Sequence, residues 1–240
     1  GIDQRRLWRL SPDGLPRPDF MPLLSLVPEP WKTMLVSSDA PAEGPRLNAA
    51  TIAAMACGLA PGSSPDSEMA SAMRETHELF LAARIFLPGL FMFSGTDLDG
   101  ALPEGTNWPS TPPLWQLDSL PASSQGLPSG FHAYSRLSGK DMDSRIKAML
   151  AARNASRISS GTLVDVPSCD SKAVFITVCS LPQGGFLAFF GNASQKKVTF
   201  SPRFSAWNEA SGKTDLLSGH SVSGTNMTLP SRGWSAVLLR

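Results

Sequence analysis

The sequence has little charge of either sign and no long apolar run. Its 21 basic and 20 acidic residues give a formal net charge of +1, and the basic residues form no cluster. Proteins that bind nucleic acid or an anionic membrane usually carry a basic patch, so the composition favours neither partner. The longest apolar stretches, at residues 23–27 and 87–93, stop well short of the roughly 20 residues that a membrane-spanning helix needs. We therefore expect no membrane span.

Three cysteines are too few and too widely spaced for a zinc-binding pattern or a disulfide framework. They are Cys57, Cys169 and Cys179. Because an odd number of thiols cannot all pair, a reducing compartment is the simpler interpretation. We expect a cytoplasmic protein in which these cysteines act as small buried hydrophobic side chains.

Histidines and cofactor motifs are equally scarce. The three histidines fall on an expected helix, in a loop and in a turn between strands, without the spacing of metal ligands. They are His77, His132 and His220. No dinucleotide-binding, phosphate-binding or nucleophile-elbow string occurs. The sequence therefore predicts no metal and no cofactor.

The N-terminal segment lacks the apolar core of a signal peptide and begins with Gly rather than Met. We expect the sequence to be a segment of a longer protein. Three Asn-x-Ser/Thr strings are glycosylation signals only if the protein is secreted. They begin at Asn154, Asn192 and Asn226.

Two proline-rich stretches interrupt the regular patterns. Residues 1–32 contain six prolines, which exclude a long helix there. Residues 100–139 are the least regular part of the chain, and a loop of this length is usually functional. Within it, Trp108 and Trp115 either anchor the loop to a core or stack on a sugar ring.

Two short strands and two helices are predicted in the first hundred residues. Pro88 and Gly89 end a helix, and the apolar run that follows at residues 90–93 predicts a strand buried on both faces. Residues 33–36 predict an earlier strand. Between them we expect a helix at residues 45–59 and a second one that starts with Ser64 as its cap and Pro65 as its first residue. This order predicts a right-handed crossover between parallel strands.

A third helix begins near Asp141 or Asp143. Its apolar residues predict a buried face, and its basic residues predict an opposite, solvated face. The apolar set is Met142, Ile146, Met149 and Leu150; the basic set is Arg145, Lys147 and Arg153.

From Gly161 onward, short β-rich runs alternate with turn signals, which predicts an antiparallel sandwich of about seven strands. The runs lie at residues 162–166, 174–180, 186–190, 197–200, 214–217, 227–229 and 234–239. We place a domain boundary near Ser159, with an α/β segment and its proline-rich coil at residues 1–159 and the sandwich at residues 160–240.

This order of elements resembles the C-terminal part of the α-amylase superfamily, glycoside hydrolase family 13, including its trehalose-synthase-like members. The resemblance implies the fold class α/β plus all-β, with a partial (β/α)8-barrel segment followed by an antiparallel β-sandwich of the domain C type. The strings that carry it are the helix, Leu-Pro-Gly and strand passage at 82–100, Met-Leu-Ala-Ala-Arg at 149–153, Gly-Thr-Leu at 161–163, Ala-Phe-Phe-Gly-Asn-Ala-Ser at 188–194 and Gly-Trp-Ser-Ala-Val at 233–237.

The resemblance also implies candidate site residues. Family members use a nucleophile Asp, an acid/base Glu and a second Asp after the seventh strand that stabilises the transition state. Only Asp39 matches one of these positions, the last, and it follows two serines where the family has Asn and His. Asp39 alternatively caps the following helix or forms a turn with residues 40–41. Asp97, Trp108 and Trp115 are the candidate substrate-binding residues.

The implied function is the C-terminal portion of an α-glucoside-acting glycosidase or transglycosidase, whose complete form takes an α-linked gluco-oligosaccharide or disaccharide. The strands for the nucleophile and the acid/base would precede residue 1, so we expect the chain to be inactive alone. The alternative is a non-catalytic module with a degenerate barrel that binds sugar or another polypeptide. Open barrel edges would be covered by the proline-rich segments or by self-association.

Overall fold

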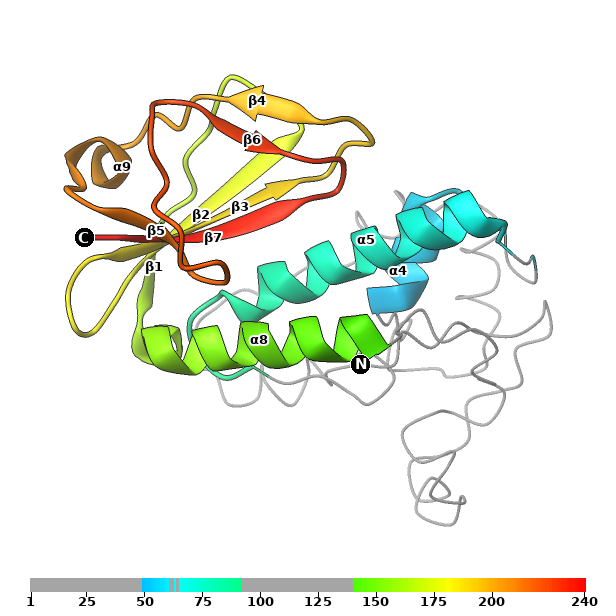
Figure 1. Ribbon diagram of the computed structural model, residues 1–240, viewed down its shortest axis with the longest axis horizontal. Helices are drawn as coiled ribbons and strands as arrows, with labels where there is room; N and C mark the ends of the chain where they lie inside the picture. The colour runs from blue at the N-terminus through cyan, green and yellow to red at the C-terminus, as the bar shows by residue number, and fades with distance from the viewer. Residues whose placement is uncertain (1–48, 61–62, 64, 92–139) are drawn as a thin grey trace, which may run out of the picture. The chain divides into compact units, whose positions relative to one another are not determined.

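The computed structural model describes residues 49–60, 63, 65–91 and 140–240 (Figure 1). The chain divides into two compact units, one of residues 1–74 and 92–138 and the other of residues 75–91 and 139–240. Both sheets belong to the second unit. The domain boundary near Ser159 stays a prediction.

Two helices lie in the described part of the first unit, and the second of them continues into the other unit. They are α4 (Ala49–Ala56) and α5 (Ser67–Ile85). The backbone N–H of Met69 donates to the Asp66 carboxylate at 2.7 Å, so Asp66 caps α5. The predicted start at Pro65 is therefore wrong: the helix begins later, because Asp66 supplies the acceptor that its first turn needs.

Seven strands form two antiparallel sheets in the second unit, as the turn-separated β-rich runs predict. The five-stranded sheet has the order β1 (Thr162–Asp165), β2 (Val174–Ser180), β3 (Phe186–Asn192), β7 (Trp234–Leu239) and β5 (Lys213–Asp215). The two-stranded sheet pairs β4 (Val198–Phe200) with β6 (Met227–Leu229). The helices and the antiparallel sheets together confirm the predicted fold class, in which a helical segment is followed by an antiparallel β-sandwich.

One face of the large sheet packs on the small sheet. Alternate residues of β3 point to this side, so Ala188 and Phe190 join a core with Phe200 from β4 and Trp207 from the short helix α9 (Ser205–Glu209). The Phe190 and Trp207 rings meet edge to face with their centroids 5.3 Å apart. The arrangement is a sandwich whose second layer is two strands and one helical turn.

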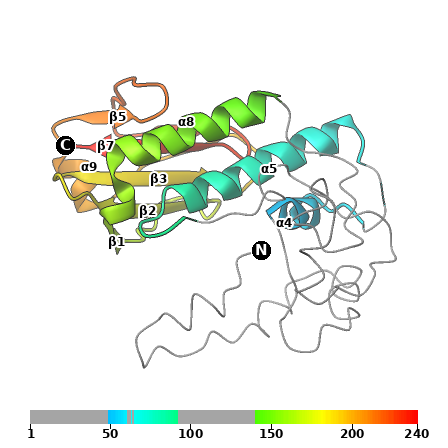
Figure 2. The ribbon, with the colours of Figure 1, turned by 90° about the horizontal axis from the view of Figure 1, so that it is seen from below.

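The opposite face of the large sheet is covered by helices. The second half of α5 and α8 (Lys140–Ser156) run along it (Figure 2). Phe86, just after α5, lies with its ring centroid 6.1 Å from that of Phe189 and 5.9 Å from that of Trp234. The central strands β2, β3 and β7 therefore pack against the small sheet on one face and against helices on the other, while the edge strand β1 is exposed.

Arg153 of α8 lies on the buried face of its helix. It follows Met142, Ile146 and Met149 at helical spacing, and it is 6% exposed. Its guanidinium donates to the carbonyl oxygens of residues 85, 87 and 89 at the end of α5. The prediction that Arg153 faces solvent is wrong, because these carbonyls replace water as its partners.

The end of β3 is held by a buried amide. Asn192 is 0% exposed, and its Nδ2 donates to the carbonyl oxygens of Lys196 at 2.8 Å and Pro230 at 2.6 Å. Its Oδ1 accepts from the backbone N–H and the hydroxyl of Ser194. The side chain therefore uses both its donors and its acceptor within the protein, and it joins the turn after β3 to the segment before β7.

The predicted barrel strands fall mostly outside the described residues. This holds for residues 33–36 and for residues 92–93. Leu90 is 79% exposed, and neither Leu90 nor Phe91 lies in a strand. The prediction of a buried strand is therefore wrong for these two residues. Within the described ranges, no helix combines the length and the apolar character needed to cross a membrane.

Candidate functional site

The residues predicted from the sequence to act in catalysis and sugar binding all lie outside the described residues. They are Asp39, Asp97, Trp108 and Trp115. Their roles and their proximity to one another stay predictions. The described part of the chain includes, besides the Asn192 turn, two further places where polar side chains from different elements meet.

The first is a junction of three elements around Glu78 of α5. Glu78 is 8% exposed, and its Oε1 accepts from the indole N–H of Trp234 at 2.9 Å and from the Arg145 guanidinium at 2.5 Å. Burial raises the pKa of Glu78, and the hydrogen bond from Trp234 and the charge of Arg145 act in the opposite direction. The carboxylate thus connects α5 to β7 and to α8.

A weaker ion pair flanks this junction. Arg232, before β7, lies 3.9 Å from the carboxylate of Glu75, one helical turn before Glu78. The partners of the Glu78 Oε1 atom come from the protein itself, and the side chain is nearly closed to water. We therefore interpret the junction as a structural contact that holds the helices against the sheet, rather than as a ligand site.

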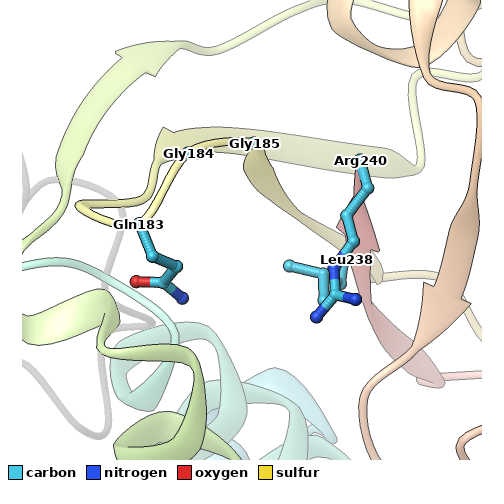
Figure 3. A pocket seen from close by; sticks show the side chains of 5 residues that line it. All are labelled: Gln183, Gly184, Gly185, Leu238 and Arg240. Atoms are coloured by element: carbon cyan, nitrogen blue, oxygen red, sulfur yellow. The ribbon is translucent and has the colours of Figure 1, made fainter.

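The second place is a surface pocket beside the hairpin between β2 and β3. It has a volume of about 400 Å³ and is lined by Gln183, Gly184, Gly185, Leu238 and Arg240. Figure 3 shows the Gln183 side chain extending toward the space beside Leu238 and the Arg240 guanidinium. The pocket thus combines one cation, one amide and an apolar side chain.

The hairpin beside this pocket requires glycine at two turn positions. Gly184 and Gly185 have φ angles of +91° and +78°, which glycine adopts readily. A Cβ on Gly185 would lie 2.5 Å from the carbonyl oxygen of Leu239, so only glycine lets the turn approach β7 this closely. The Gly-Gly pair between two strands was the sequence signal for this turn, but nothing in it indicated a pocket.

Metal ligands do not gather in the part of the chain that the structure describes. No group of three or more His, Cys, Asp or Glu side chains there could hold a metal ion. The described cysteines are free thiols, and Cys179 is buried. Burial raises the pKa of the Cys179 thiol to about 11, which makes it a poor nucleophile.

Comparisons of sequence and of structure give different results. No protein-family model and no curated protein sequence matches this chain. Solved structures do match. The crystal structure of AmyP in complex with maltose superposes with a TM-score of 0.50 at 16% identity, over 73% of this chain and 36% of AmyP. The α-amylase of Geobacillus thermoleovorans, complexed with acarbose, also gives a TM-score of 0.50, at 8% identity, over 72% of this chain and 36% of the enzyme.

These matches concern the fold, because the identities are too low to carry function. The chain spans about a third of the length of the structures it matches. In this chain, helices are followed by an antiparallel sandwich. This is the order of elements that the resemblance to the α-amylase superfamily implies. The protein therefore has an amylase-like fold that corresponds to part of an amylase chain.

Proposed function

We propose that this chain is the C-terminal portion of an α-glucoside-acting glycosidase or transglycosidase of glycoside hydrolase family 13, of the α-amylase or trehalose-synthase type. The observation that carries the proposal is the structural match to an amylase-like protein with bound maltose, combined with the order of elements from helix to sandwich. In this proposal the substrate of the complete protein is an α-linked gluco-oligosaccharide or disaccharide, and the protein is cytoplasmic.

The 240-residue chain alone should not turn over such substrates. Its sequence offers Asp39 as the only match to the three family carboxylates. A glycosidase of the retaining type needs a nucleophile and an acid/base, and acid/base catalysis alone contributes about 10²–10⁴-fold. The test is an assay with maltose, trehalose and starch. Turnover above the no-enzyme control that Asp39→Asn abolishes would contradict the proposed inactivity.

Sugar binding distinguishes this proposal from the alternative of a non-catalytic module. We expect the chain to bind maltotriose in preference to the β-linked cellotriose, measured by calorimetric titration. If the site is the remnant of an amylase cleft, Asp39→Asn or Asp97→Asn should weaken maltotriose binding by about tenfold, the loss of one charge-assisted hydrogen bond. Binding that both variants leave unchanged would favour a separate sugar site on a degenerate module. Binding of neither sugar would favour a protein-interaction role.

Self-association is a further part of the proposal. An incomplete barrel presents unpaired strand edges, and pairing of two chains is one way to cover them. Light scattering across a range of concentrations tests this: a dimer supports self-association, and a monomer favours coverage by the chain's own proline-rich segments.

A further inference from the structure

We draw no further inference here: the strongest candidate, the exposed apolar patch that Leu163, Val164 and Val166 form on and just after the edge strand β1, carries nothing, because the strand is short and its register with β2 is interrupted, which disfavours pairing with another strand, and nothing in the described part of the structure shows what covers it.

Discussion

Glu78 connects α5, α8 and β7, and burying its carboxylate to do so has an electrostatic cost. Its carboxylate lies out of water, which disfavours the charged form, yet it accepts hydrogen bonds from Trp234 and Arg145. Burial has the larger effect, so the folded protein holds a proton on Glu78 more tightly than the unfolded chain does. The free energy of unfolding therefore depends on pH through this residue.

The first prediction concerns this pH dependence. The contribution of Glu78 to stability is fully present below its ordinary pKa of 4.5 and is lost as the pH rises through its raised pKa in the folded protein. Glu78→Gln removes this titration and keeps an acceptor for Trp234. Urea unfolding between pH 4.5 and 7 should therefore show wild type losing stability relative to Glu78→Gln as the pH rises. The opposite slope would mean that attraction by Arg145 outweighs burial.

The second prediction concerns thiol reactivity. Because burial raises the pKa of Cys179 to about 11, very little of it is thiolate at pH 8. Cys169 is partly exposed. Iodoacetamide should therefore label Cys169 before Cys179 in the native protein, as read by mass spectrometry, and these two residues at similar rates in urea. Native labelling of Cys179 at the rate of Cys169 would show that β2 opens readily.

At the scale of elements, the end of α5 depends on a side chain from α8. Helix ends leave carbonyl oxygens without partners. Here Arg153 donates to the carbonyls of Leu87 at 2.6 Å and Gly89 at 2.5 Å and also to that of Ile85, while its guanidinium lies 5.6 Å from the centroid of the Phe91 ring. The backbone N–H of Gly89 donates in turn to Ser159, at 3.0 Å. The ends of the two helices are thus joined by side-chain and backbone hydrogen bonds.

The third prediction is that Arg153→Met destabilises the protein by about 3 kcal/mol, because shielded carbonyls without donors cost roughly 1–3 kcal/mol each. Lys147→Met is the matched control, since Lys147 is an exposed cation on the same helix. It should change the free energy of unfolding by less than about 0.5 kcal/mol. The midpoints of urea unfolding give both values. Similar small effects in both variants would show that water can replace the Arg153 hydrogen bonds.

The elements that the sequence predicted well are those with local signals. All seven strands appear where short β-rich runs separated by turn residues predict them. The start of α5 was predicted with Ser64 as the cap, whereas Asp66, two residues later, accepts from the first turn; both residue types are good caps, so the sequence does not distinguish them. The short α9 has too few residues for a periodic pattern. Arg153 was assigned to solvent because of its charge, although its spacing from Ile146 and Met149 already placed it on the buried face.

The polar groups of the described part were harder to predict than its strands. Glu78 reaches a partner 156 residues away, in Trp234, and no local pattern indicates such a contact. The pocket likewise joins a hairpin turn to the end of β7, which are distant in sequence. The carboxylate and tryptophan positions taken from the family resemblance lie outside the described residues, so they remain predictions.

At the scale of the second unit, the small sheet covers only one face of the large sheet, and the other face needs the helices. Phe189 and Trp234 pack against Phe86, next to α5, with ring centroids about 6 Å apart, at 6.1 Å and 5.9 Å. Exposing a large apolar side chain costs about 1.5–3 kcal/mol. A segment limited to the seven strands would leave this face open to water.

The fourth prediction follows from this packing. The segment of residues 160–240 should be expressed in an aggregated or dye-binding form, because the helix-facing side of its sheet is uncovered. The segment of residues 65–240 keeps α5 and α8 and should unfold cooperatively as a soluble protein. Circular dichroism and binding of an apolar dye compare the two. Cooperative unfolding of residues 160–240 would support a domain boundary near Ser159 and show that the helices contribute little.

The Asn192 side chain has a consequence for the choice of expression host. Asn192 begins an Asn-x-Ser string, and oligosaccharide transfer would replace a hydrogen on the same Nδ2 that donates to Lys196 and Pro230. A glycan also has no room at a side chain that is 0% exposed. Chains modified there during secretion should fail quality control, so peptide mapping of the secreted fraction should find Asn192 bare. Asn226 is exposed, and its occupancy by a glycan would be compatible with the folded state.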